Sequence, residues 1–412
     1  MIRTESVIVK PTKSLNVMLS DSRAIYDQAL YFLRQTYFET KKAREENPSL
    51  KIKTPSFNEL YALVKVTDIF KNSIIDYNIK VLVVQQVSDM WKSFIKATIQ
   101  FNKNPKRFTG RPLMPKYLAR AKKEFNVVTI SSGRIAKKNC AINELRLPKC
   151  NFKFKMPSYI DKKSIKCLRI LKFYDKIKIE IIYEKPIKVK EYDNEHSIGI
   201  DMGVNNLMAI TSNEQNLSWL INGRPLKSIN QFYNKKLSKL TSIKATKQLQ
   251  KLHRKRKNKV DNYLHWASKK VIELCLENEI SKIVIGKNDG WKTDANMGKR
   301  NNQNFVQIPH ARLIQMIDYK AKERDIEVLL TEESYTSKID HLVNEPLKHQ
   351  EKYLGKRLKR GMYMSSLGQT LNADINGAIG ILRKKNVISD VQLMNLRNRG
   401  DVVSPVKLFK AC

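Results

Sequence analysis

The chain has 412 residues, enough for two or three domains that each bury a hydrophobic core. It contains 78 Lys and Arg against 39 Asp and Glu, and the formal net charge of +39 favours a polyanionic partner, because contact with phosphates offsets the self-repulsion. A hydrophobic fraction of 42% excludes a disordered basic tail.

No apolar run approaches the roughly 18–20 residues of a membrane span, and the N-terminal sequence MIRTESVIVK lacks the core of a signal peptide. The five cysteines form no CxxC pair. We therefore expect a cytosolic protein with reduced cysteines, no disulfides and no membrane partner.

The first hundred residues predict one strand and three helices. Residues 4–10 alternate like a short strand, and apolar residues at three-to-four spacing predict helices at 21–46, 57–71 and 78–102. The third helix carries Lys80 and Gln86. We nominate both for contact with nucleic acid, since Gln suits bidentate contact with adenine, although a Gln on a helix is commonly just solvated.

A basic loop and a series of strands follow. Residues 103–123 contain eight Lys and Arg and no acid, as expected of a track for a nucleic-acid backbone, with Arg111, Lys116 and Tyr117 as candidate contacts. From 125 to about 190, apolar residues alternate with Lys or Arg in short segments, which predicts a β-barrel or sandwich with a basic face. We expect the first strand to belong to this β-domain, so that the helices are an insertion.

The segment HSIGIDMGVNNLMAITS at 196–212 predicts a buried strand, a turn and a second strand. Asp201 lies among Ile198, Ile200 and Met202. A buried carboxylate is costly unless it is paired or binds a metal, so Asp201 is a candidate metal ligand. The alternative is an Asp that turns the strand out to solvent.

Residues 227–270 hold fourteen Lys and Arg and one acid, with apolar residues at helical spacing. Two basic helices are predicted there. Such a lopsided balance favours contact with a nucleic-acid backbone over a merely solvated face. The candidate contacts are Arg254, Arg256 and Lys257.

Strands and helices alternate in the last third of the chain. KIVIGK at 282–287 and IEVLL at 326–330 predict strands, and the apolar spacing over 309–324 predicts a helix between them, as in a parallel α/β sheet. The segment LNADINGAIGILR at 371–383 predicts a helix that begins near Asp374 and packs closely on a sheet through its small residues.

Three acids then stand at the ends of separate elements, where α/β folds place their sites: Asp201, one of Glu332 and Glu333, and Asp374. Two-metal cleavage of a phosphodiester needs about three carboxylates around two cations, and sites built from oxygen suit Mg²⁺ or Mn²⁺. The order Asp, Glu, Asp on strand, strand end and helix is that of an RNase H-like nuclease.

The motifs GIDMGVNNLMAITS, FYNKKLSKL with LHRKRKNKV, YKAKERDIEVLLTEESYTSK and NADINGAIGIL together resemble TnpB, the RNA-guided nuclease family of insertion sequences, which is related to type V CRISPR effectors. The resemblance implies a multidomain α+β protein. A wedge β-barrel at 1–15 and 105–193 would be interrupted by a helical recognition domain at 16–104, and an RNase H-like (RuvC) α/β nuclease domain would cover 194–412.

The resemblance also implies function and partners. The protein would bind a guide RNA derived from the transposon end, recognise a short target-adjacent motif and cleave double-stranded DNA with Mg²⁺. It would be cytoplasmic, prokaryotic and nucleoid-associated when bound to DNA. The sequence gives no information on the motif, the guide length or the cleavage pattern.

The sequence departs from the common family pattern at the middle Glu. Most members carry this Glu at the end of the fourth strand, where Gly286, Lys287 and Asn288 stand here. Glu333 stands instead at the end of the adjacent strand, as in Fanzor and some TnpB groups. Parallel strands lie about 4.8 Å apart, so a Glu side chain can bridge the displacement. We assign Glu333 as third ligand with Glu332 as its alternative, because adjacent strand residues point to opposite faces.

A second departure concerns zinc. The family usually has four cysteines between its TS motif and the last Asp, but residues 337–373 contain only His341 and His349. Tetrahedral zinc needs four good ligands, so we expect a degenerate insertion at about 337–372 without zinc. Its loop GKRLKRG at 355–361, with Lys356 and Arg357, is a candidate nucleic-acid contact or a solvated loop.

Two other functions compete with an RNA-guided endonuclease. A nuclease-inactive, RNA-guided DNA-binding repressor is favoured by the missing fourth-strand Glu. The retained Asp201 and Asp374 favour the nuclease. A strand-joining transposase of the same fold is the third interpretation, and the extensive basic β-domain and helices argue against it.

Overall fold

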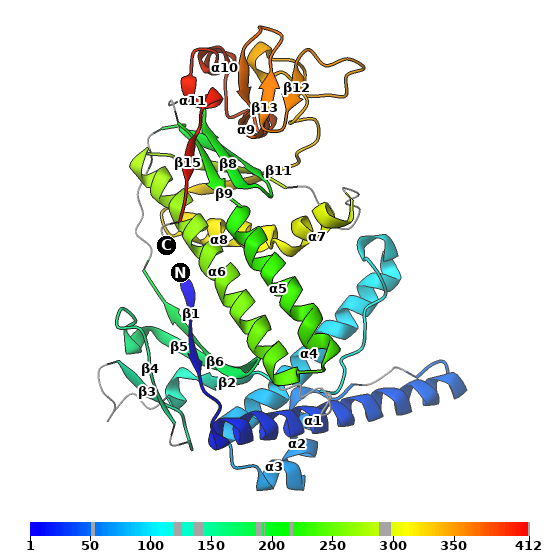
Figure 1. The fold of residues 1–412 in the computed structure, drawn as a ribbon. Coiled ribbons are helices and arrows are strands. Elements are labelled where there is room, and N and C mark those ends of the chain that lie inside the picture. The colour runs from blue at the N-terminus through cyan, green and yellow to red at the C-terminus, as the bar shows by residue number, and fades with distance from the viewer. Residues whose placement is uncertain are drawn as a thin grey trace. The chain divides into compact units, whose positions relative to one another are not determined.

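The computed structural model describes residues 1–50, 54–118, 126–135, 143–150, 152–186, 192, 194–214, 217–287 and 298–410, without the side chains of 299–301 and 304. The chain divides into two compact units, Met1–Pro186 and Ile187–Cys412 (Figure 1). In the described chain, Cys150, Cys167 and Cys275 are free thiols; Cys140 and Cys412 lie outside it. None of the described helices is long and apolar enough to cross a membrane.

The first unit contains a four-stranded antiparallel sheet in the order β1-β6-β5-β2. Strand β1 (Ile2–Val9) pairs along its whole length with β6 (Lys176–Glu184), so strands from before and after the helices share one sheet. The others are β5 (Ile165–Phe173) and β2 (Val128–Ser131), and β3 (Glu144–Arg146) and β4 (Lys153–Lys155) form a separate ribbon. The described strands pair as an open sheet and a ribbon, so the predicted β-barrel or sandwich stays a prediction.

Four helices lie between β1 and β2, namely α1 (Lys13–Glu46), α2 (Phe57–Lys65), α3 (Asp68–Asn72) and α4 (Tyr77–Lys103). The single helix predicted over 57–71 is two helices. Ser56 and Glu59 form a capping box at the start of α2, and the Thr67 side chain accepts a hydrogen bond from the Phe70 amide and starts α3. The cap at Thr67 follows the end of one helix and begins the next. The apolar spacing of the sequence does not by itself show that a second helix begins there.

The second unit is organised around a six-stranded mixed sheet in the order β11-β10-β7-β8-β9-β15. The strands β11, β10 and β7 run parallel, β8 is antiparallel to both of its neighbours, and β15 pairs parallel with β9. Their bounds are β7 (Ser197–Met202), β8 (Asn206–Ser212), β9 (Ser218–Asn222), β10 (Lys282–Gly286), β11 (Glu327–Thr331) and β15 (Val406–Leu408).

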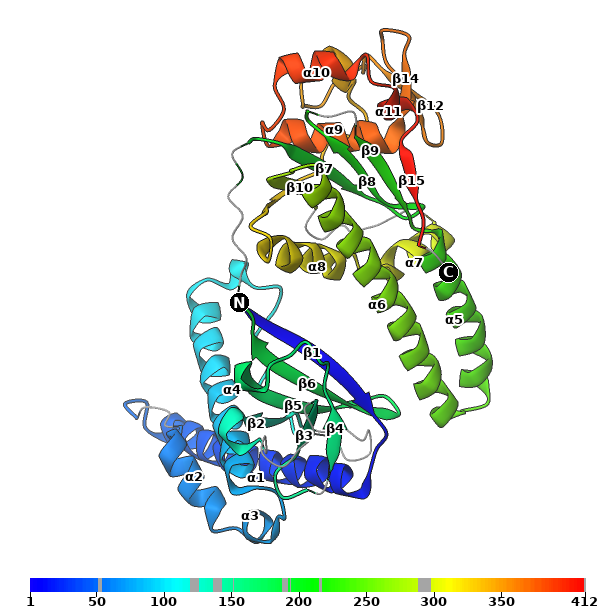
Figure 2. The same cartoon turned by 90° about the vertical axis from the view of Figure 1, so that its left-hand side faces the viewer.

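Helices cover both faces of this sheet (Figure 2). On one face, α6 (Thr246–Glu277) and α8 (His310–Lys322) pack their apolar sides against Ile198 and Ile200 of β7. On the other face, α9 (Ala373–Lys384) packs over Val284 of β10 and Ala209 of β8. The central strand β7 is therefore buried from both sides, which explains its nearly continuous apolar sequence.

The remaining helices of this unit are α5 (Arg224–Ser242), α7 (Lys299–Gln307), α10 (Asp390–Leu396) and α11 (Gly400–Val403). Between β11 and α9, the strands β12 (Lys356–Lys359), β13 (Met362–Met364) and β14 (Thr370–Asn372) form a small antiparallel sheet. Residues 355–361 are thus a strand and a tight turn, rather than the predicted loop. Short 3₁₀ turns cover Pro105–Arg107, Ser132–Arg134, Lys162–Ser164 and His341–Val343.

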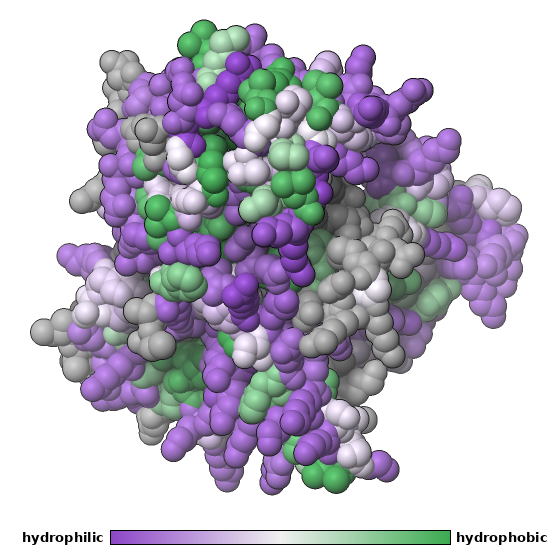
Figure 3. All heavy atoms as spheres, turned by 45° about the horizontal axis from the view of Figure 1, so that its top comes forward, coloured by the Kyte–Doolittle hydropathy of each residue, from purple (hydrophilic) through white to green (hydrophobic). Residues whose placement is uncertain are grey.

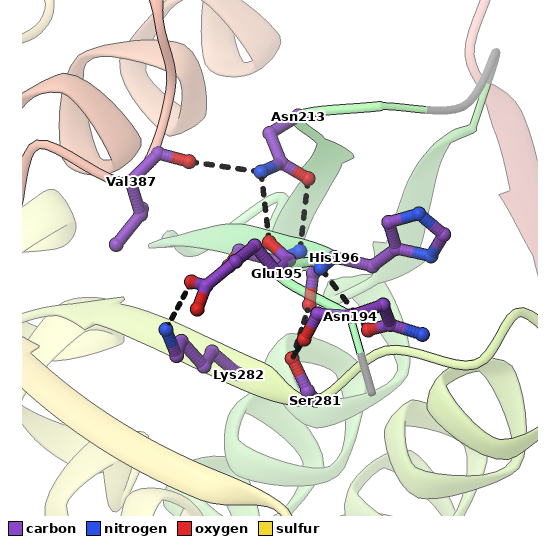
Figure 4. A network of polar contacts seen from close by, with 8 residues as sticks. Asn194, Glu195, His196, Asn213, Ser281, Lys282 and Val387 are labelled. Carbon is purple, nitrogen blue, oxygen red and sulfur yellow. Dashed lines mark hydrogen bonds and ion pairs between the residues drawn. The ribbon is translucent and has the colours of Figure 1, made fainter. Parts of the chain in front are cut away.

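A polar network fixes the entry to β7 (Figure 4). The Asn213 side chain accepts from the Ser197 amide at 2.8 Å and donates to the carbonyls of Glu195 at 3.2 Å and Val387 at 2.9 Å. The Ser281 hydroxyl donates to the His196 carbonyl at 3.1 Å. These hydrogen bonds join the start of β7 to β8, to β10 and to the chain after α9. They help to fix the register of β7, and with it the position of Asp201 near the end of this strand.

Replacing Asn213 by Ala removes three hydrogen bonds and leaves a buried amide and carbonyls without this partner. We expect the free energy of unfolding to fall by roughly 3 kcal/mol. The measurement is urea denaturation of the full chain against Asn395→Ala, which truncates an exposed Asn on α10. Equal free energies of unfolding for the two variants would contradict a stabilising role of this polar network.

Candidate functional site

Asp201 lies near the end of the central strand β7, where helix α9 approaches closely. A Cβ added to Gly199 would collide with the Ala378 carbonyl oxygen and would lie 2.8 Å from Leu382 Cγ, and a Cβ at Gly377 would lie 2.8 Å from Asp201 Oδ2. Gly199 therefore has no room for a side chain against the backbone of α9, and a side chain at Gly377 would displace the Asp201 carboxylate. This close approach places the first turn of α9, with Asp374, beside Asp201.

Asp374 is held from two sides. The Asn372 side chain caps α9 and accepts from the Asp374 amide at 3.0 Å. The Asn206 side chain, at the start of β8, donates to Asp374 Oδ2 at 2.7 Å, and Arg357 of β12 lies 3.8 Å from Oδ1. Asn206 was not a candidate from the sequence, because nothing in the sequence distinguishes an Asn that contacts a site residue from one that only forms a turn.

Glu333 follows β11 and reaches across to β10. Its Oε1 lies 2.5 Å from where a Cβ of Gly286 would be. The register pairs Gly286 with Thr331, two residues before Glu333. Glu332 behaves differently, because its side chain is 68% exposed and lies 3.9 Å from Lys384. Of the two candidates, Glu333 is the one that faces the sheet and the space beside Gly286.

The three acids interact electrostatically. Burial, then the charges of Glu333 and Asp374, raise the pKa of Asp201 to about 8, while Arg357 acts in the opposite direction. Burial raises the pKa of Glu333 to about 7, opposed by Lys384. Asp201 therefore lies close enough to be influenced by both other carboxylates, and a hard divalent cation is a group that would relieve this unfavourable charge. In the conformation described, no three His, Cys, Asp or Glu of the described residues form a ready-made metal cluster.

Several candidate nucleic-acid contacts are instead used within the fold. Lys80 is 7% exposed and donates to the Phe70 carbonyl at 2.6 Å. Gln86 exchanges hydrogen bonds of 3.0 and 3.1 Å with Asn126. These placements argue against the nomination of Lys80 and Gln86, because Lys80 lies on the buried face of α4 and the Gln86 amide is paired with Asn126.

Nominated residues on the basic helix α6 also make contacts within the fold. Arg256 stacks on Tyr233 at 4.8 Å and donates to Asn230 at 2.8 Å, and Lys257 lies 3.3 Å from Asp261. Arg254 is half-buried.

The other nominees, Arg111, Lys116, Tyr117, Lys356 and Arg357, are exposed. Figure 3 shows one face of the molecule on which hydrophilic residues predominate and apolar ones form small separate patches. The exposed cations therefore remain candidates for contact with a polyanion.

The insertion between β11 and α9 is held together by buried carboxylates. Asp340 is fully buried and accepts from Ser365 Oγ and the Ser366 amide, both at 2.7 Å. Glu345 accepts from the Asp340 amide at 2.7 Å. His341, one of the two histidines in this segment, is buried, and its Nε2 contacts the Thr336 carbonyl at 2.8 Å. The ring of the exposed His349 contacts Tyr335. Hydrogen bonds thus join the two turns of the insertion.

Comparisons with known proteins match two family models to segments between residues 180 and 381 of the chain. Residues 180–292 match the OrfB_IS605 family, described as "Probable transposase". Residues 310–381 match the "Cas12f1-like, TNB domain" family. The first segment contains β7 with Asp201, and the second contains Glu333 and Asp374. A search of curated proteins finds no match to this chain.

Solved structures also resemble the chain. One is the "Cas12f1-sgRNA-target DNA complex", at 14% identity over 93% of this chain and 100% of that chain, with a TM-score of 0.37. Another is the "mini-RNA-guided endonuclease CRISPR-Cas_phi3", at 10% identity over 96% of this chain and 92% of that chain, with a TM-score of 0.46. TM-scores this low do not establish a common fold over the whole chain.

The raised pKa of Asp201 predicts a pH dependence of stability without metal. The folded chain retains this proton up to about pH 8, whereas the ordinary value for the unfolded group is 3.8. The folded state thus binds more protons across this range, so its free energy of unfolding falls as pH rises from about 4 to 8. We expect Asp201→Asn to flatten this dependence and to be more stable than wild type at pH 8.

Thermal denaturation in EDTA at pH 5, 6.5 and 8 measures this effect. Asp318→Asn is the control, since Asp318 belongs to an exposed pair with Lys322 on α8. Parallel curves for wild type and Asp201→Asn would show that Asp201 does not retain its proton.

Gly286→Ala tests the space that Glu333 occupies. The new methyl group would lie 2.5 Å from Glu333 Oε1 and 2.7 Å from Cδ1 of the buried Ile381, so we expect the melting temperature to fall and any cleavage that needs Glu333 to fall by about tenfold or more. Gly400→Ala is the matched control, because nothing lies within 4 Å of a Cβ there. Single-turnover cleavage of DNA and a melting curve are measured for both variants; unchanged cleavage in Gly286→Ala would contradict the assignment.

Proposed function

Since the chain is TnpB-like over the segments that the two family models match, we propose that it is an RNA-guided DNA endonuclease. The observation that carries the proposal is the convergence of Asp201, Glu333 and Asp374 from β7, from the end of β11 and from the first turn of α9. Carboxylates that repel one another in a protein with a net charge of +39 are expected at a site where cations and phosphates meet.

We propose an RNase H-like (RuvC) fold for the nuclease unit. Its support is the sheet, in which a central Asp-bearing strand has two parallel neighbours on one side and an antiparallel hairpin on the other. The wedge and recognition domains are proposed for the sheet and the helices of the first unit. The boundary between units at Pro186 lies seven residues before the predicted domain boundary.

Asp201, Glu333 and Asp374 would hold Mg²⁺ or Mn²⁺. Such a metal pair, when bound, activates a water and stabilises the leaving oxygen of the phosphodiester. The chain's own residues prepare the site. Asn206 fixes the orientation of Asp374, and Gly377 leaves room for Asp201. Because the pKa values of Asp201 and Glu333 are raised, both acids must give up protons before they serve as ligands.

The proposed partners are a guide RNA and target double-stranded DNA. Their chemistry matches the excess of positive charge and the exposed cations of the loop around Arg111 and Lys116. The origin of the RNA in the transposon end, and a cytoplasmic location, follow from the TnpB resemblance and belong to the same proposal.

The position of the Glu333 carboxylate favours the nuclease over the inactive repressor. The repressor interpretation rests on the absence of a Glu from the end of β10. The Glu333 carboxylate lies where a side chain at Gly286 would begin, so a carboxylate is present in that space although another strand supplies it.

Cleavage by purified protein with its co-expressed RNA tests the function, on plasmids with randomised target-adjacent bases and Mg²⁺. We expect linear product, and a loss of about 10³-fold in rate for Asp201→Ala and for Glu333→Ala, because each removes a ligand that stabilises charge in the transition state.

Glu332→Ala is the matched control and retains activity, because Glu332 is exposed. If Glu332→Ala is inactive and Glu333→Ala cuts normally, the ligand assignment is wrong. Target binding without cleavage under all metal conditions would favour the repressor.

A further inference from the structure

A basic pocket of about 510 Å³ opens beside Asp374. Four of its lining residues are cations, Arg224, Arg357, Arg360 and Lys407, and Asp374 is its single acid. Its volume lies in the range of about 300–1,000 Å³ that is typical of ligand sites. The pocket belongs entirely to the second unit.

The cations come from three distant parts of the chain. Arg224 begins α5, directly after the turn that packs Gly223 against the Val204 carbonyl. Arg360 lies in the turn between β12 and β13, next to Gly361, whose positive φ of 80° suits glycine. Lys407 lies on β15, where it is paired in register with Leu220 of β9. The C-terminal strand thus supplies one side of the pocket.

Three of these charges have no neutralising partner among the described residues. Arg357 lies 3.8 Å from Asp374. For Arg224, Arg360 and Lys407, all exposed, no carboxylate of the described residues lies within ion-pair distance. Three cations at fixed positions around one cavity repel one another, and this arrangement favours a ligand with several negative charges.

The lining also identifies the part of a nucleic acid that fits. The described residues of the lining include no aromatic side chain on which a base would stack, and the apolar side chains among them are Val204 and Leu220. Cations without aromatic platforms bind the sugar–phosphate backbone and are indifferent to sequence.

We propose that this pocket binds the backbone of a single DNA strand next to the phosphate to be cleaved, with Arg224, Arg360 and Lys407 on neighbouring phosphates. The proposal rests on the proposed nuclease function, because Asp374 forms one wall. Lys407 and Arg224 are positioning residues, and the C-terminal strand is a part of the substrate site.

The test is binding of fluorescein-labelled dT12 to the full chain in EDTA, measured by anisotropy over a series of salt concentrations. The variant is Arg224→Gln with Arg360→Gln and Lys407→Gln. The control is Lys348→Gln with Lys352→Gln and Lys385→Gln, which removes the same charge from exposed positions of the same unit.

We expect the pocket variant to bind dT12 at least about tenfold more weakly than the control. The slope of log K against log salt should fall by about 2, because each contacted phosphate of a single strand contributes about 0.7. Equal affinities and slopes for the two variants would overturn the proposal. Melting curves establish that both variants are folded.

Two further arms distinguish the alternatives. A loss of affinity confined to rU12 would assign the pocket to the guide RNA and overturn the DNA assignment. With dT12 whose central phosphates are neutral methylphosphonates, wild type should lose affinity and the pocket variant should lose less. The binding assay contains no metal and measures no cleavage. A failure of the plasmid-cleavage assay would therefore count against the nuclease function and would not change the result for binding of dT12.

Discussion

The candidate site depends on how closely α9 lies on β7. The helix carbonyl at Ala378 lies against Gly199, and Gly377 lies against the Asp201 carboxylate, so no side chain separates the two elements at these points. A larger residue at either glycine would lift the helix and move Asp374 with it. The polar network of Asn213 at the other end of β7 fixes the register, so helix and strand are positioned independently of the acids that they carry.

A glycine also leaves room for the Glu333 side chain. Strands β10 and β11 are parallel neighbours, and Gly286 leaves the volume that the Glu333 side chain enters from the adjacent strand. The Glu333 side chain can span the separation of about 4.8 Å between the strands because Gly286 has no side chain to exclude it. In the proposed site, the third carboxylate therefore comes from the end of β11 and not from β10.

The insertion between β11 and α9 shows how a small sheet is joined to this site by hydrogen bonds. Asp340 and Glu345 join its turns, and β12 carries Arg357 to Asp374. The insertion and the C-terminal strand β15 both contribute cations beside the acids. Among the cations of the basic pocket, Arg357 lies 3.8 Å from Asp374 and counteracts the rise in the pKa of Asp201. The other three, Arg224, Arg360 and Lys407, have no carboxylate of the described residues within ion-pair distance.

The sequence alone determined the elements whose signals are local. The periodicity of 78–102 gave a helix that the structure has at Tyr77–Lys103, and the apolar run around Ile200 gave the buried strand with Asp201. Only the tertiary structure showed that the Glu332 side chain is exposed while that of Glu333 lies beside Gly286. It also placed Lys80 inside the helical layer, Asn206 on Asp374, and Arg224 and Lys407 in the pocket beside Asp374. Local patterns record which face of an element is apolar, whereas contacts between residues more than a hundred positions apart depend on strand order and on how closely helices approach, which no local pattern contains.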